Sequence, residues 1–169
     1  TNAAEEAHMT RTLDDWLDAY GDSHRNPVNK TIHRIAVPII VLDLLGFLHL
    51  VPTHALGSFV PPASWLLVIG ALAFYVRLSP PLAIGMLLLA LPSMAALDAG
   101  LAALGTWALP ALVAVFGVTW AAQFVGHALE GKKPSFFEDV QYLLIGPLWL
   151  LADAYRRLGL KTTVAGEAV

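Results

Sequence analysis

The chain has 169 residues, of which 57% are hydrophobic and 14% are charged, and its net charge is −3. Soluble domains carry about 25% charged residues, so this composition indicates one integral-membrane domain over residues 1–169. The absence of cysteine excludes disulfides, thiolate nucleophiles and thiolate metal sites. No cluster of basic and aromatic residues indicates nucleic-acid binding.

The first 34 residues precede the first long apolar block. Residues 1–9, TNAAEEAHM, resemble an expression remnant, whereas residues 10–34 contain an amphipathic helix pattern followed by a histidine motif. The apolar residues that recur at helical spacing in this pattern are Leu13, Trp16, Leu17 and Tyr20. We expect this helix to lie on the membrane or to pack on the bundle.

The histidine motif SHRNPVNKTIH, residues 23–33, begins the next helix. Asn26 is a suitable N-cap, and Pro27 suits the first helical position. A helix that begins there places Asn29 and His33 one turn apart on the same face, with His24 just before the helix. It continues into the first apolar block through Pro38, which is expected to kink it.

Residues 35–126 contain four apolar blocks, each long enough or nearly long enough to cross a bilayer, which takes roughly 17–25 residues. The blocks are Ile35–Val51, Ala63–Leu78, Leu82–Leu97 and Thr106–Gly126, and residues 51–62, 78–81 and 98–105 between them resemble turns. A fifth block, Tyr142–Ala152, is too short to cross and contains Gly146-Pro147. The sequence therefore predicts an all-α polytopic membrane helix bundle. It should have about four transmembrane helices, an N-terminal amphipathic helix and a C-terminal re-entrant or interfacial helix.

The positive charges indicate the orientation of this bundle. With four crossings, all ten Lys and Arg residues fall on one side, and the loops 52–62 and 98–105 carry none. Because basic residues concentrate on the cytoplasmic side, both termini are expected to be cytoplasmic. The short termini and the absence of a retrieval signal favour a bacterial inner membrane over the endoplasmic reticulum.

A second polar cluster begins the C-terminal region, residues 127–169, at the end of the fourth block. Gln123, His127 and Glu130 lie on one helix face, and the predicted topology places His127 at the depth of His24 and His33. Imidazoles with nearby carboxylates suit iron, zinc or manganese, and an open set of two histidines and one carboxylate is typical of non-haem Fe(II) oxygenases. The simpler interpretation is that each histidine caps a helix or lies at the membrane interface.

Two motifs resemble the signatures of a known family. The first is H-x-N-P-x-N-x-x-I-H at residues 24–33, followed by Val37-Pro38. The second is Q-F-V-G-H at residues 123–127, followed by Glu130, Lys132, Lys133 and Pro134. Together they resemble the 2-hydroxy fatty acid dioxygenases, which are small membrane proteins.

This resemblance implies Fe(II)-dependent α-oxidation, in which a long-chain 2-hydroxy fatty acid and O2 give the acid one carbon shorter. It also implies the metal ligands His24, His33, His127 and His49, with Glu130 as a further candidate. Because the hydroxyl and carboxylate of the acid can chelate iron, the metal would be held where the polar head meets the lipid bilayer. Asn26, Asn29 and Gln123 would orient the ligands, and Lys132, Lys133, Arg25 or Arg34 would neutralise the substrate carboxylate.

His49 does not fit this centre easily. It follows His33 by 16 residues, about 24 Å along a straight helix, so one iron binds both only if Pro38 and Gly46 break the helix. Otherwise His49 is structural or belongs to a separate site.

Two other classes of protein remain as alternatives. A membrane di-iron desaturase is disfavoured, because the sequence lacks H-x-x-x-H and H-x-x-H-H boxes. A non-catalytic membrane carrier or scaffold with a structural metal site would share the same bundle, with Asp43 and Asp98 as pathway residues.

Overall fold

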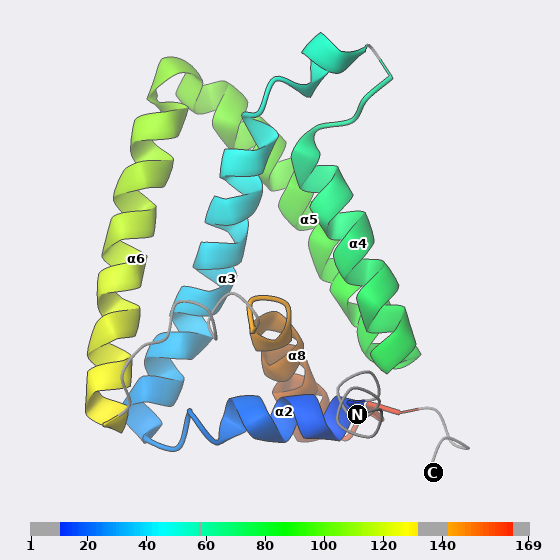
Figure 1. Ribbon diagram of the computed structural model, residues 1–169, viewed down its shortest axis with the longest axis vertical. Coiled ribbons are helices and arrows are strands. Elements are labelled where there is room, and N and C mark those ends of the chain that lie inside the picture. Colours follow the sequence, from blue (N-terminus) through cyan, green and yellow to red (C-terminus); the bar gives the residue numbers. More distant parts are fainter. Residues whose placement is uncertain (1–10, 58, 132–141, 164–169) are drawn as a thin grey trace, which may run out of the picture.

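The computed structural model describes residues 11–57, 59–131 and 142–163, and all regular elements within them are helical (Figure 1). The all-α fold class is therefore confirmed. The elements in chain order are α2 (Leu13–Gly21), α3 (Pro27–His49), η1 (Thr53–Leu56), α4 (Ala63–Leu78), α5 (Pro80–Leu104), η2 (Gly105–Trp107), α6 (Ala108–Glu130) and α8 (Ile145–Arg157).

Local sequence signals explain where α2 and α3 begin. Thr12 caps α2 in a capping box with Asp15, in which the Thr12 hydroxyl accepts from the Asp15 amide and the Asp15 carboxylate accepts from the Thr12 amide. Asn26 caps α3 by accepting from the amides of Val28 (2.9 Å) and Asn29 (3.4 Å), with Pro27 at the first helical position. The helix continues through Pro38 without ending.

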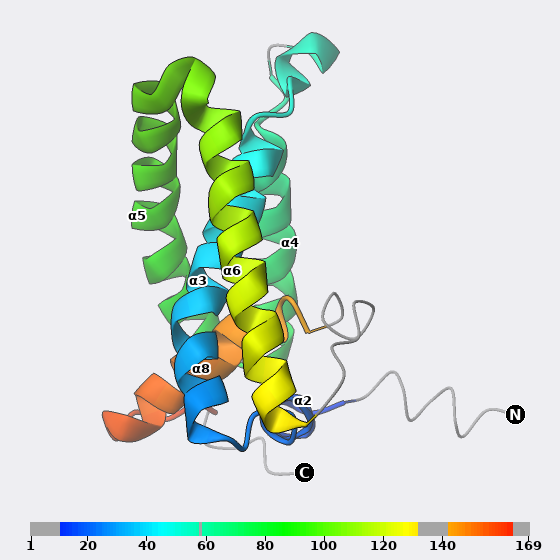
Figure 2. The ribbon, with the colours of Figure 1, turned by 90° about the vertical axis from the view of Figure 1, so that its left-hand side faces the viewer.

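The long helices form a splayed bundle. α5 and α6 are joined by η2 into a hairpin, so the chain turns back at the end opposite α2 (Figures 1 and 2). α6 returns along α3, in the most extensive interface between two helices, while α4 packs beside α5. The reversal occurs at Gly105, whose φ of 54° suits glycine.

The break between helices that the sequence indicated at residues 98–105 begins only at Gly105 in the structure. α5 remains helical to Leu104, and only Gly105 leaves the helix. Residues 98–104 are rich in alanine and leucine, which are strong helix formers. This favours continuation of the helix past Gly100.

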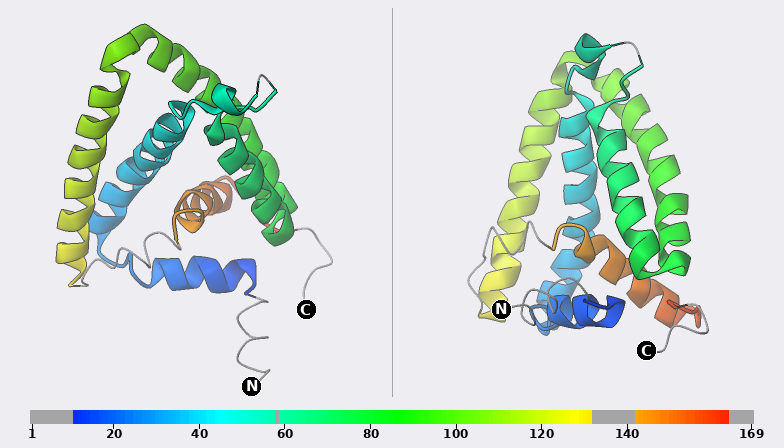
Figure 3. Two further views of the ribbon diagram at one scale, coloured as in Figure 1. Left: turned by 45° about the horizontal axis from the view of Figure 1, so that its top comes forward. Right: turned by 45° about the vertical axis from the view of Figure 1, so that its right-hand side comes forward.

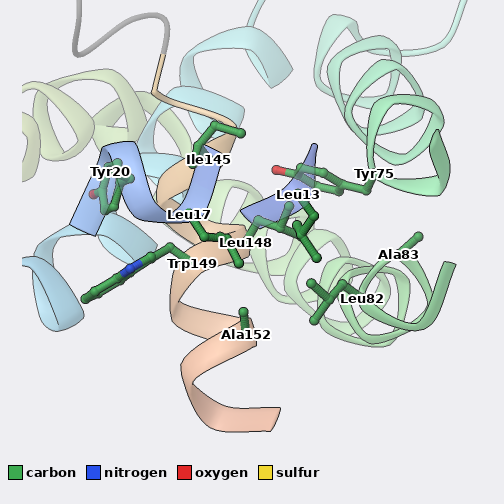
Figure 4. Close-up of a cluster of buried hydrophobic side chains, with 10 residues drawn as sticks. All are labelled: Leu13, Leu17, Tyr20, Tyr75, Leu82, Ala83, Ile145, Leu148, Trp149 and Ala152. Carbon is green, nitrogen blue, oxygen red and sulfur yellow. The ribbon is translucent and has the colours of Figure 1, made fainter. Parts of the chain in front are cut away.

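At the other end, α8 lies between α3 and the α4–α5 pair, and α2 crosses beneath it (Figure 3). Pro147 is tolerated because it lies in the first turn of α8, where an amide hydrogen has no intrahelical partner. A buried core, formed by residues of α2, α4, α5 and α8, joins the four helices. Its members are Leu13, Leu17, Tyr20, Tyr75, Leu82, Ala83, Ile145, Leu148, Trp149 and Ala152 (Figure 4). The amphipathic N-terminal helix thus packs on the bundle.

Two segments are long and apolar enough to cross a membrane by length and composition, Pro27–His49 and Pro80–Glu130. The second contains α5, η2 and α6 and folds back on itself, and Ala63–Leu78 is a shorter apolar helix. The four crossings expected from the sequence are not confirmed by this test and stay a prediction. Large apolar side chains nevertheless point outward along these helices, including Ile69, Leu88 and Val118.

Candidate metal centre

His24, His33 and His127 lie together where α6 ends and α3 begins. His24 belongs to the turn between α2 and α3, His33 to the second turn of α3, and His127 to the last turn of α6. The ring centroids of His24 and His33 are 4.2 Å apart, those of His33 and His127 are 5.0 Å apart, and those of His24 and His127 are 6.0 Å apart. All three side chains are buried. The structure therefore brings together three of the four histidines that the sequence suggested as ligands.

Backbone carbonyls fix the protonation of two of these rings. His24 Nδ1 is 2.6 Å from the Tyr20 carbonyl oxygen, and His33 Nδ1 is 3.1 Å from the Asn29 carbonyl oxygen. Because a carbonyl oxygen only accepts, we assign the hydrogen of each neutral ring to Nδ1, which leaves the lone pair on Nε2. Metal-binding histidines usually donate their other N–H in this way.

The donor chemistry of the cluster fits a divalent metal, since imidazoles with fixed tautomers suit iron and zinc. Among the residues that the structure describes, no three His, Asp or Glu side chains already have the arrangement of a metal site. The three rings therefore offer the residue types of a metal centre, without its arrangement in this structure.

Aromatic rings enclose His24. Tyr20 stacks on it with ring centroids 4.2 Å apart and an interplanar angle of 18°, and the Trp149 ring lies 5.9 Å away. Figure 4 shows Tyr20 and Trp149 side by side, on α2 and α8. Sequence reasoning did not assign either residue to the site. The four-residue spacing of Tyr20 and His24 was a usable signal, whereas the contact with Trp149 is purely tertiary.

Glu130 holds the turn before α3 against the end of α6. Its carboxylate accepts from the backbone amides of Arg25 (2.7 Å) and Asn26 (2.9 Å) and from the Asn29 side chain (2.9 Å). A carboxylate is also favourable near the amino end of a helix such as α3. These contacts support a positioning role for Glu130, and its role as a metal ligand stays a prediction.

Two amides beside the histidines carry buried oxygen atoms without a hydrogen-bond donor in the described structure. They are Asn29 Oδ1 and Gln123 Oε1. The Asn29 orientation is fixed because its Nδ2 donates to Glu130 and, at 3.3 Å, to the Ser23 carbonyl. Gln123 lies one turn before His127 on α6. Since a buried acceptor without a donor is costly, both oxygens suit a hydroxyl or water bound at the cluster.

Gly126 allows α6 to approach α3 at this point. A Cβ atom built there would collide with Asn29 Oδ1 and lie 3.5 Å from His33 Cε1. The glycine of the Q-F-V-G-H motif thus has a steric reason that the sequence alone did not reveal.

His49 lies at the opposite end of α3, away from the cluster. Its Nδ1 is 3.2 Å from Ser64 Oγ, and its Nε2 is 3.3 Å from Asp98 Oδ1. Because α3 folds back neither at Pro38 nor at Gly46, His49 ties α3 to α4 and α5 instead of joining the other histidines.

Four basic residues were suggested to neutralise the substrate carboxylate, and the structure describes two of them. Arg25 pairs with Asp22 at 2.6 Å, and Arg34 pairs with Asp153 at 3.2 Å. Lys132 and Lys133 lie outside the described residues.

The chain is similar in sequence to known proteins over most of its length. Residues 10–158 match the family model described as "2-hydroxy-palmitic acid dioxygenase Mpo1-like". The chain is 32% identical over 147 residues to a Saccharomyces cerevisiae protein named 2-hydroxy-palmitic acid dioxygenase MPO1, and the match covers 85% of this chain and 79% of the yeast protein. No solved structure matches the chain significantly. With both histidine motifs inside the matched range, the chain belongs to the Mpo1-like family.

Proposed function

We propose that this protein is an Fe(II)-dependent dioxygenase that shortens long-chain 2-hydroxy fatty acids by one carbon. The observation that carries the proposal is the convergence of His24, His33 and His127 from three separate segments into one buried cluster. Family membership, with a yeast relative named as a 2-hydroxy-palmitic acid dioxygenase, supports the reaction class and the substrate.

In this proposal the three histidines hold the iron, with Nε2 of His24 and His33 as donor atoms. Fe(II) bound there would supply the redox chemistry that O2 needs in order to react with an organic acid. The carbonyls of Tyr20 and Asn29 keep the two rings in the required tautomer. Glu130 fixes the turn that carries His24, through its bonds to the amides of Arg25 and Asn26.

The overall reaction balances with O2 as the only oxidant. The bond between C1 and C2 of the 2-hydroxy acid breaks, C1 leaves as CO2, and C2 becomes the new carboxyl carbon. This oxidation releases four electrons, which reduce one O2, and one water forms. We therefore expect no requirement for nicotinamide or flavin.

The substrate hydroxyl distinguishes this reaction from oxidation of a simple fatty acid. Asn29 Oδ1 and Gln123 Oε1 are buried acceptors at the cluster, so either can accept a hydrogen bond from that hydroxyl. Burial of the cluster behind Tyr20 and Trp149 also keeps bulk water away and strengthens such polar contacts. Lys132 and Lys133, next to the α6 end in sequence, are our candidates for the substrate carboxylate, together with Arg25 and Arg34.

A lipid bilayer is the proposed location. Two apolar segments and the outward apolar side chains of α5 and α6 support this placement. We further propose a bacterial inner membrane, with both termini and the histidine cluster on the cytoplasmic side.

Product analysis tests the function. Purified, iron-loaded protein is incubated in detergent with 2-hydroxypalmitate and O2, and the products are measured by mass spectrometry. We expect pentadecanoate and CO2 from 2-hydroxypalmitate, and no product from palmitate, which lacks the chelating hydroxyl.

Two variants on α3 make this assay specific. His33→Ala should abolish product formation, and His49→Ala, at the other end of the same helix, should retain it. No turnover of any 2-hydroxy acid by fully iron-loaded wild type would refute the enzyme assignment and support the carrier or scaffold with a structural metal site.

A further inference from the structure

An apolar cavity of about 420 Å³ lies between α3, α4, α5 and α8. This volume is within the range of about 300–1,000 Å³ typical of pockets that hold small molecules. Its wall is almost entirely aliphatic, apart from Ser93 and Tyr75. The Tyr75 hydroxyl already donates to the Leu144 carbonyl at 2.7 Å. A cavity of this character suits a hydrocarbon chain and lacks the donors that a polar ligand needs.

One face of α3 connects the cavity to the histidine cluster. His33, Val37 and Val41 follow one another at four-residue spacing and so lie on the same side of the helix. His33 belongs to the cluster, Val37 is buried, and Val41 lines the cavity. The rise of the helix places Val41 about 12 Å beyond His33.

The beginning of α8 makes the same connection from the opposite side. Pro147, Leu150 and Leu151 line the cavity, while Trp149 lies 5.9 Å from the His24 ring. Between them, a Cβ atom built on Gly146 would lie 3.0 Å from the Tyr20 hydroxyl and 3.3 Å from Val37 Cγ1. α3 and α8 thus pack closely at this glycine, between the cluster and the cavity.

We propose that this cavity holds the acyl chain of the 2-hydroxy fatty acid while its carboxylate and hydroxyl lie at the three histidines. The inference rests on the proposed function. The acyl chain would run along α3 beside α4 and α5, and it would enter the cavity past Pro38 and Pro147, which line it, when the close contact between Val37 and Gly146 opens. Because the tail leaves one apolar surrounding for another, the cavity selects by shape and length and contributes little hydrophobic driving force.

Chain-length selectivity gives one test. Ala71 on α4 and Ala90 on α5 line the cavity, so Ala71→Leu and Ala90→Leu fill part of it. Each should lower kcat/KM for 2-hydroxypalmitate by at least about 10–200-fold relative to 2-hydroxyoctanoate, because a misfit of even one methylene in an apolar pocket has effects of this size. The matched controls Ala73→Leu and Ala96→Leu, at exposed positions of the same two helices, should leave the ratio unchanged. A cavity variant that affected both substrates equally would overturn the inference.

A binding measurement tests the cavity independently of turnover. 2-Hydroxypalmitate with a diazirine at the end of its chain is crosslinked by light, and the labelled peptides are mapped. We expect labels within residues 67–75 or 86–93, reduced by excess 2-hydroxypalmitate and by Ala90→Leu.

The outcomes of this measurement separate the two proposals. If the cavity is labelled but the wild type shows no turnover, the proposed reaction is refuted and the binding site is supported. Label elsewhere on the bundle, or label in the cavity that palmitate displaces as well as 2-hydroxypalmitate does, would overturn the inference. The second result would identify a general site for lipid tails.

Discussion

Gly126 shows how the site depends on a missing side chain. Gly126→Ala should push α6 away from α3, because the new Cβ collides with Asn29 Oδ1, and overpacking of this kind costs about 1–3 kcal/mol. We expect a lower thermal unfolding midpoint in detergent and reduced iron binding. Gly117→Ala, on the same helix where a Cβ meets nothing within 4 Å, is the control. Equal behaviour of the two variants would contradict the close approach seen here.

Asn29 links the histidine cluster to the Glu130 carboxylate. Asn29→Ala removes the hydrogen bonds to Glu130 and Ser23, so we expect a loss of about 10–100-fold in iron affinity or activity, as is usual for residues that orient metal ligands. Circular dichroism should show unchanged helix content. Thr31→Ala, which removes only an exposed bond to the Pro27 carbonyl, should behave like wild type. Full activity of Asn29→Ala would show that Asn29 has no role in the site.

At this scale the sequence predicted the histidines better than their surroundings. His33 and His127 could be placed because helical spacing and membrane depth follow from local patterns. Trp149 could not be placed, since it lies 125 residues after His24 and reaches it only through the packing of α8. The orientation of Glu130 toward backbone amides was equally inaccessible, because it depends on how the turn before α3 meets the end of α6.

Among the helices, α2 begins with a capping box of Thr12 and Asp15 that can be tested by changing the pH. Hydrogen bonds from Thr12 lower the pKa of Asp15 below its ordinary value of 3.8. A lowered folded-state pKa stabilises the helix above that ordinary value, and the contribution is lost as the pH falls through the folded-state pKa. We expect the protection factors of the α2 amides, which correct for the pH dependence of intrinsic exchange, to fall below about pH 4 in wild type and to be lower at all pH values in Thr12→Ala. Identical exchange in both proteins would show that the cap contributes nothing.

Helix ends were predictable where capping signals are strong. Asn26-Pro27 marked the beginning of α3 correctly. The run at 98–105 was misleading, because its glycine and small residues resemble a turn while alanine and leucine favour continued helix. The block Tyr142–Ala152 was expected to be re-entrant or interfacial, and the structure shows a helix from Ile145 to Arg157 packed between others. No local pattern specifies such packing.

For the whole molecule, charge is distributed unevenly between the two ends. Within the described residues, Arg and Lys occur in or beside α2, α4, α8 and the first third of α3, and none occurs in η1, α5 or α6. The segments that carry basic residues lie at the end of the molecule that contains the histidine cluster (Figure 1). In α4 the basic residue is Arg77, in the last turn, which is also at this end. The asymmetry expected from the sequence is therefore also present in space, and it favours this end as the cytoplasmic one.

Single cysteines can test this orientation because the chain has none of its own. Leu56→Cys, in η1, and Leu158→Cys, after α8, replace side chains that are 80% and 72% exposed. Membrane-impermeant labelling of intact cells should modify Leu56→Cys only, and Leu158→Cys should react after permeabilisation. Labelling of both from the same side would contradict the four-crossing arrangement.

Iron content tests whether His24, His33 and His127 together hold one Fe(II), as we propose. Wild-type protein reconstituted with Fe(II) under nitrogen and freed of excess metal should retain about one iron per chain by mass spectrometry. The triple variant His24→Ala, His33→Ala, His127→Ala should retain almost none, with unchanged helix content by circular dichroism, and His49→Ala should retain the wild-type amount. Wild-type iron content in the triple variant would place the metal elsewhere and refute the proposed site.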